Sequence, residues 1–134
     1  MAIIGGGPGG LTAAYYLTLM GHKVTVYEQR PKLGGMLRYG IPDYRLPQEV
    51  LDRDIDYILS AGIAVHTGVS IGKDLTMADI QRSFDAVYIA IGAHNDKKLG
   101  LEGETSKNVV SAVELLRGIG EGKAPDFTGK KVCV

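Results

Sequence analysis

A run of five glycines and one proline near the start of the chain, Gly5 to Gly10, is the strongest sign of chemistry. Gly5, Gly7 and Gly10 have the G-x-G-x-x-G spacing of a dinucleotide-binding turn. In such a turn the first glycine permits a tight bend, the second lets the backbone approach a pyrophosphate, and the third lets a helix pack closely on a strand. The N-terminus of the following helix would supply free N–H groups and partial positive charge for the phosphates.

Glu28 is the second candidate binding residue. It follows the glycine run at close to the ~20-residue spacing at which an acidic residue binds the ribose hydroxyls of a dinucleotide. Its carboxylate would repel a 2′-phosphate, so we expect a cofactor without one on that ribose. The neighbouring Arg30 could favour a 2′-phosphate, but we interpret it as a solvated loop residue. The fingerprint alone serves FAD and NAD equally.

These residues require a strand, a turn, a helix and a second strand to hold them in place. The apolar pattern predicts a strand at 2–4, a helix at 11–20 closed by Gly21, and a strand at 23–27. A crossover this short joins parallel strands of one sheet. The predicted fold class is therefore α/β, a Rossmann-like domain with a central parallel sheet.

The rest of the chain continues this alternation of strands and helices. The segment from Glu28 to Leu46 is irregular, and loops of that length in compact domains are usually functional. The apolar run at 85–91 is typical of a strand buried on both faces of a parallel sheet. The other expected elements are a helix from Pro47 to Gly62, a strand at 63–67, a helix from the Thr76–Asp79 capping box to Phe84, a helix from Ser111 to Gly118, and a strand beginning at Lys131.

Composition excludes several classes of protein. Fifteen basic and fifteen acidic residues give a net charge of zero, without the basic excess that nucleic-acid binding needs. The single cysteine, Cys133, cannot form an internal disulfide, which favours the cytoplasm, and we expect it to be a small buried residue. The uncharged stretch from Met1 to Gly21 is neither a signal peptide nor a membrane span, because no positive charge precedes it and the glycines interrupt any helix.

Two further motifs identify a family resemblance. Gly34 and Gly35 follow Glu28 in the run GGMLRYGIPDYRLP, which ends at Pro47, and the apolar strand ends in AIGAH, from Ala90 to His94. With the glycine fingerprint, these motifs resemble the flavoprotein reductases with two dinucleotide domains. Within them the chain is most similar to the small subunit of NADPH-dependent glutamate synthase, and next to the flavin module of dihydropyrimidine dehydrogenase. Ile91 departs from the threonine usual at its position.

The resemblance implies a flavin enzyme that passes electrons between NADPH, FAD and iron-sulfur clusters in glutamate biosynthesis. It implies that residues 1–117 form the FAD-binding domain, and that 118–134 form a linker and the first strand of an NADPH-binding domain. Both ends would then be truncated, with the NADPH site and the cluster ligands outside this chain. A large catalytic subunit or an iron-sulfur protein is the implied partner, and self-association is a further possibility.

The resemblance also implies a set of FAD contacts. Gly6 to Gly10 would hold the pyrophosphate, Glu28 the adenosine ribose, and Ile71 the adenine through its backbone, while Arg45 would contact the flavin side. The full predicted set is Gly5, Gly6, Gly7, Pro8, Gly9, Gly10, Glu28, Gly35, Met36, Arg45, Ile71, Ala90, Ile91 and Gly92. We expect no catalytic side chain and no metal ligand, because the flavin ring itself performs hydride and electron transfer.

Alternatives remain open at three residues and for the function. Arg45 could instead cap its loop or pair with Asp43, Ile71 could be a core residue, and His94 is more simply a locally hydrogen-bonded residue than a proton donor. The chain could also be an NAD-binding fragment of a dehydrogenase, or a FAD-binding module without activity of its own.

Overall fold

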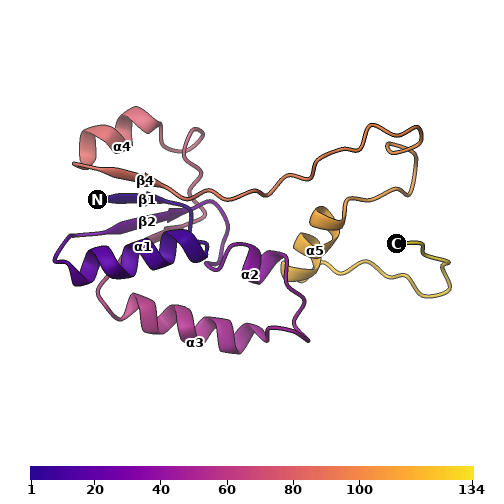
Figure 1. Cartoon of the computed structure of the whole chain (residues 1–134), viewed down its shortest axis with the longest axis horizontal. Coiled ribbons are helices and arrows are strands. Elements are labelled where there is room, and N and C mark those ends of the chain that lie inside the picture. Colours follow the sequence, from indigo (N-terminus) through magenta and orange to yellow (C-terminus); the bar gives the residue numbers. More distant parts are fainter.

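The computed structural model describes all 134 residues and contains a four-stranded parallel sheet, which lies at the left of Figure 1. The strands are β1 (Ala2–Ile4), β2 (Thr25–Glu28), β3 (Ala64–Thr67) and β4 (Val87–Ile89), and their order in the sheet is β3-β2-β1-β4. The helices are α1 (Pro8–Leu19), α2 (Met36–Tyr39), α3 (Gln48–Leu59), α4 (Met77–Ser83) and α5 (Ala112–Gly120). All strand pairs are parallel, which confirms the predicted α/β, Rossmann-like class.

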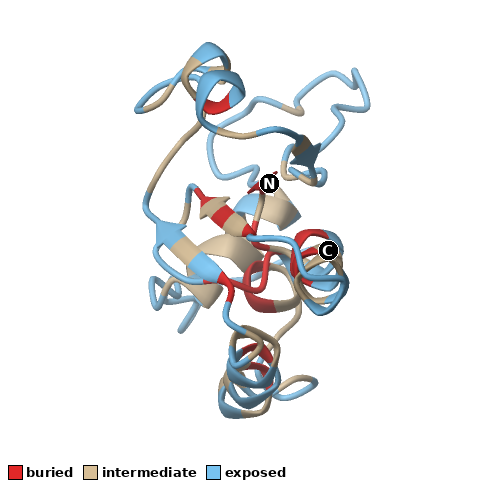
Figure 2. Cartoon of the chain, turned by 90° about the vertical axis from the view of Figure 1, so that its left-hand side faces the viewer, coloured by how far each residue is buried: buried red, intermediate tan, exposed pale blue.

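The hydrophobic core lies between the sheet and the two long helices, α1 and α3. Ile3 and Val26 supply it from β1 and β2, where they pair in register, and Leu11 supplies it from α1. Leu51 and Ile55, one helical turn apart on α3, complete the core. Helix α3 lies below the sheet in Figure 1. Figure 2 shows the buried residues gathered in the sheet and on the adjoining helices.

Most of the predicted helices form where the sequence placed them. The helix after Pro47 is α3, and Gly62 follows it with a φ of +96° that suits glycine. The capping box is present, because Thr76 Oγ1 accepts a hydrogen bond from the Asp79 amide while the Asp79 carboxylate accepts one from the Thr76 amide. The first helix, α1, begins at Pro8, three residues before the predicted start, since proline is favoured in the first turn of a helix.

The prediction of a strand buried on both faces at 85–91 was wrong. Only Val87–Ile89 forms the strand β4, which lies at the edge of the sheet beside β1. Tyr88 is 45% exposed and Ile89 is 58% exposed. A continuous apolar run indicates a preference for a dry environment, but burial of both faces of a strand requires elements packed over the sheet. In this chain β4 lies at the sheet edge and packs mainly against β1.

The C-terminal part of the chain reaches back to the domain through α5. A long irregular segment separates α5 from the sheet, and α5 packs beside the short helix α2 (Figure 1). Gly120 permits this approach, because a Cβ there would lie 2.6 Å from the carbonyl oxygen of Arg38.

Two expectations for the C-terminus were also wrong. Residues 131–134 form no strand, since no neighbouring strand lies beside them to accept their hydrogen bonds. Cys133 is exposed rather than buried, because it lies in this unpaired segment. None of the helices has the length and apolar character needed to cross a lipid bilayer.

Candidate cofactor-binding site

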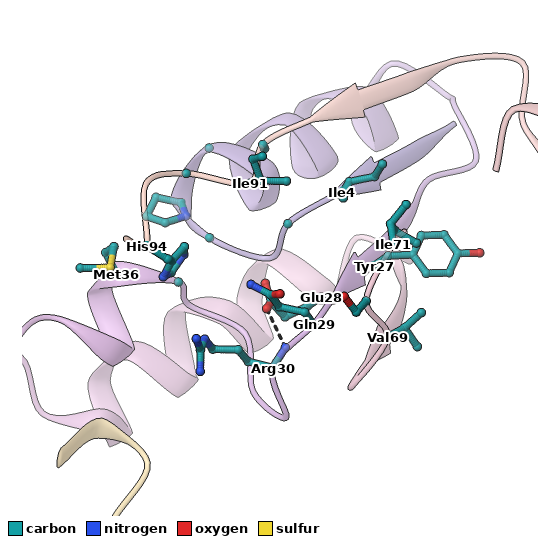
Figure 3. A pocket seen from close by; sticks show the side chains of 18 of the residues that line it. Ile4, Tyr27, Glu28, Gln29, Arg30, Met36, Val69, Ile71, Ile91 and His94 are labelled. Carbon is teal, nitrogen blue, oxygen red and sulfur yellow. Dashed lines mark hydrogen bonds between the residues drawn. The ribbon is translucent and has the colours of Figure 1, made fainter. Parts of the chain in front are cut away.

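A cavity of about 730 Å³ opens at the carboxyl ends of β1, β2 and β4, over the N-terminus of α1 (Figure 3). Its size is typical of small-molecule sites, and this end of a parallel sheet is where α/β proteins bind their ligands. All the predicted cofactor residues except Gly6, Gly10 and Arg45 line it. These lining residues are Gly5, Gly7, Pro8, Gly9, Glu28, Gly35, Met36, Ile71, Ala90, Ile91 and Gly92.

Gly5 and Gly10 lie where only a hydrogen atom fits. A Cβ on Gly5 would lie 2.3 Å from the carbonyl oxygen of Ala90, and the φ of Gly5 is +109°. A Cβ on Gly10 would lie 1.9 Å from the carbonyl oxygen of Gly5. Gly10 does not line the cavity. Its lack of a side chain lets α1 pack tightly against the turn, so that the start of α1 points into the cavity.

The N-terminus of α1 is free to bind an anion. Its N-cap is Gly7, which offers no side chain to cap the first-turn N–H groups, and no acidic residue lies in that turn. Gly35 contacts this turn directly at the cavity wall, because a Cβ on Gly35 would lie only 2.7 Å from the Cα of Gly7. The first turn of α1 therefore presents backbone N–H donors and partial positive charge to the cavity, and the residue beside it, Gly35, has no side chain to block them.

Glu28 joins the end of β2 to the glycine turn. Its Oε2 accepts a hydrogen bond of 2.7 Å from the Gly6 amide. Its Oε1 accepts one of 2.8 Å from the Arg30 amide, the dashed line in Figure 3. The side chain is only 7% exposed but still lines the cavity. Gly6 does not line the cavity, and its amide is bound to the Glu28 carboxylate.

The two ends of the cavity differ in character. Tyr27, Val69 and Ile71 lie beside Glu28 at one end, where they offer an apolar surface (Figure 3). Met36 and His94 lie at the other end, near the start of α1. An elongated ligand with an apolar ring at one end and charge near its middle would match this arrangement.

A buried arginine holds the Gly34–Gly35 loop in place, and sequence reasoning did not find it. Arg38 on α2 is 3% exposed. It donates to the Leu33 carbonyl oxygen and to Gln48 Oε1, both at 2.5 Å, and to the Asp52 carboxylate. The loop is thereby fastened to α3. No local pattern marks such a residue, because its partners lie on a different helix.

Arg45 lies outside the cavity, exposed on the segment between α2 and α3. The alternative pairing with Asp43 is not formed either, since Asp43 Oδ1 accepts from Gln48 Nε2. The contact of Arg45 with a cofactor stays a prediction.

Three basic residues that were not in the predicted set line the cavity: Arg30, His94 and Arg117. The interpretation of Arg30 as a solvated residue was wrong, because its guanidinium pairs with Glu121 at 2.5 Å and lies 5.1 Å above the ring of Tyr39. Arg117, in the last turn of α5, donates to the backbone carbonyl oxygen of His94. The sequence gives no sign of this meeting, because α5 is joined to the sheet only through a long irregular segment.

His94 binds a proton less readily than an ordinary histidine. Burial in the cavity wall lowers its pKa below the usual 6.5, the positive charges of Arg30 and Arg117 lower it further, and the charge of Glu28 opposes them. At neutral pH the imidazole is therefore uncharged.

This lowered pKa predicts a contribution to the pH dependence of stability. The unfolded chain protonates His94 at a higher pH than the folded chain, so the stability that neutral His94 contributes is present above pH 6.5 and is lost as the pH falls below it. We expect His94→Gln to lose less stability than the parent between about pH 7.5 and about pH 5.5, as measured by urea unfolding. Identical losses in the two proteins would contradict this assignment.

The comparisons with known proteins agree with this geometry. Residues 3–68 match the model of the NAD(P)-binding Rossmann-like domain. The chain is 42% identical, over 136 residues and 100% of its length, to the NADP(+)-dependent formate dehydrogenase subunit beta of Moorella thermoacetica. It is 40% identical, over 116 residues and 87% of its length, to the glutamate synthase [NADPH] small chain of Mycobacterium tuberculosis. It spans 19% and 24% of these two proteins.

A solved structure shows the same fold. Mycobacterium tuberculosis FprA, determined in complex with NADPH, superposes with a TM-score of 0.83 at 23% identity. The match covers 96% of this chain and 31% of FprA.

Proposed function

We propose that this chain forms the FAD-binding part of an NAD(P)H-dependent oxidoreductase. The proposal starts from its similarity to the glutamate synthase small chains and to NADP-dependent oxidoreductase subunits. The observation that supports this most directly is the contact of Gly7 with Gly35 at the wall of one cavity that Glu28 also lines. A glycine fingerprint alone fits any dinucleotide. The second glycine segment, Gly34 and Gly35, belongs to the motif on which the resemblance to flavoprotein reductases rests.

The residues of the cavity fit FAD in three places. The uncapped start of α1 would bind the pyrophosphate, and Glu28 would accept hydrogen bonds from the adenosine ribose. Gly35 and Met36, on the wall facing α1, would lie on the flavin side. When bound, the flavin ring supplies hydride and electron transfer, so this chain would bind and orient it and needs no nucleophile of its own.

The remaining partners belong to the same proposal. Electrons would pass from NADPH to FAD and on to an iron-sulfur protein or a large catalytic subunit, with the NADPH and cluster sites outside residues 1–134. Residues 1–117 would form the FAD-binding domain, and 118–134 would lead to an NADPH-binding domain. We place the protein in the cytoplasm, because its single cysteine suits a reducing compartment.

A visible absorption spectrum tests the cofactor. The purified chain is incubated with FAD and freed of unbound cofactor on a desalting column before the spectrum is recorded. A second sample is incubated with NAD and treated in the same way; because NAD has no visible absorption band, its retention is measured by an enzymatic assay of the cofactor released on denaturation. We expect flavin bands that remain with the folded protein in the first sample. A folded chain that retains NAD but never flavin would contradict the proposal and favour the dehydrogenase alternative, which the match to an NAD(P)-binding model also supports.

A further inference from the structure

Three basic side chains in the cavity have polar atoms that are buried without a hydrogen-bond partner. They are Arg30 Nε, His94 Nδ1 and Arg117 Nε. The only other atom of this kind in the chain is the hydroxyl oxygen of Thr18, which lies outside the cavity. The two arginine Nε–H groups are donors, whereas the uncharged imidazole of His94 can donate or accept at Nδ1. Buried polar atoms without partners are costly, so their concentration in one cavity indicates a ligand whose acceptor atoms would satisfy the two arginines.

Of the two arginines that line the cavity, only Arg117 lacks a carboxylate partner. Arg30 is paired with Glu121, and both oxygens of Glu28 accept from backbone amides. Arg117 forms no salt bridge with any carboxylate, and its only recorded partner is the carbonyl oxygen of His94. A half-buried guanidinium in this state attracts an anion, because desolvation strengthens its interaction with a negative charge.

Helix α5 holds Arg117 against the cavity in a defined way. Ser111 caps the start of the helix, and Gly120 lets its end approach the backbone of Arg38 on α2. Glu121, directly after the helix, binds Arg30. Arg117 thus reaches the cavity from a helix that is docked at two points, not from a free loop.

We propose that Arg117, with Arg30 beside it, binds the phosphate oxygens of the dinucleotide, so that α5 completes the cofactor site. This inference rests on the proposed function and adds to it a binding residue that the sequence motifs do not contain. The uncapped start of α1 would contact the diphosphate through backbone N–H groups, and Arg117, which lines the same cavity, would neutralise its charge. Arginine suits this role because its planar fork can donate two hydrogen bonds to one phosphate.

Titration of the whole chain with FAD, followed by flavin fluorescence, tests the inference. We expect Arg117→Met to weaken FAD binding about tenfold or more, because a charge-assisted hydrogen bond is lost, and Arg117→Lys to weaken it less. Arg53→Met is the matched control, since Arg53 is exposed on α3 and outside the cavity, and it should bind FAD as the parent does. The salt dependence of FAD binding should also decrease in Arg117→Met and not in the control.

A second variant separates anion binding from simple docking of α5. Glu121→Gln replaces the ion pair between Arg30 and the C-cap of α5 with a weaker neutral contact, leaves Arg117 charged, and leaves the charge of Arg30 available to phosphate. We expect this variant to bind FAD at least as tightly as the parent. If Glu121→Gln and Arg117→Met weaken binding equally, or if Arg117→Met binds like the parent, this inference is overturned while the proposed function stands. A parent chain that binds no FAD would instead overturn the proposed function.

Discussion

Gly10→Ala is expected to destabilise the fold by about 3 kcal/mol, at the upper end of the usual cost of overpacking a tight interior site. The new Cβ would lie 1.9 Å from the carbonyl oxygen of Gly5, and that oxygen belongs to backbone rather than to a side chain that could turn away. Helix α1 would have to move off the turn, although its residues Leu11 and Ala14 are buried. Urea unfolding followed by circular dichroism measures the loss.

Gly9→Ala is the control for this prediction. Gly9 is the neighbouring residue of the same helix turn, and a Cβ there would have no neighbour within 4 Å. Since alanine is a better helix former than glycine, the variant should be as stable as the parent or more stable by about 0.5 kcal/mol. Equal stabilities of Gly10→Ala and Gly9→Ala would show that the close packing of α1 on the turn does not hold.

The parts of the fold that could be predicted depend on local patterns. Strand β1, the glycine turn and α1 follow one another within a short stretch, so apolar spacing and glycine positions specify them together. Helix α3 and the capping box at Thr76 are likewise specified by residues close together in the sequence. The resemblance to the glutamate synthase small chains could also be found in the sequence, because its glycine motifs are contiguous runs. The similarity to the Mycobacterium tuberculosis small chain confirmed it.

The errors arose where distant residues decide the environment. The apolar run of β4 was expected inside the sheet, but its position at the edge depends on the order of all four strands. Cys133 was expected to be buried, but no element packs over its segment. Helix α2 is only four residues long, and it is stabilised by the side-chain contacts of Arg38 rather than by its own sequence pattern.

The candidate site divides in the same way. Gly7, Gly35 and Ala90 line the cavity with their backbone and could be predicted from the sequence. Each belongs to a short motif of glycine or small residues that is typical of a dinucleotide-binding site. The charged wall could not be predicted, since Arg30, His94 and Arg117 meet only after α5 has docked on α2. Sequence motifs therefore describe the half of the cavity formed by the β1–α1–β2 unit, and tertiary packing supplies the other half.

Gly35→Ala is expected to lower the affinity for FAD about 100-fold, which corresponds to about 2.7 kcal/mol. Two effects combine at this residue. Its φ of +53° and ψ of −134° are strained for any residue with a side chain, and its Cβ would lie 2.7 Å from the Cα of Gly7. The Gly34–Gly35 loop would have to withdraw from the turn, and the wall that faces the start of α1 would be displaced. Fluorescence titration with FAD measures the loss.

Gly62→Ala separates the two effects. Gly62 also has a positive φ, +96°, but a Cβ there would meet nothing within 4 Å, and the residue follows α3 outside the cavity. This control should lose about 1 kcal/mol of stability from backbone strain and keep the FAD affinity of the parent. If both variants lost affinity equally, general destabilisation would explain the result. An affinity loss in Gly35→Ala alone would mean that FAD binding needs the close approach of the two glycine segments, Gly5 to Gly10 and Gly34 to Gly35.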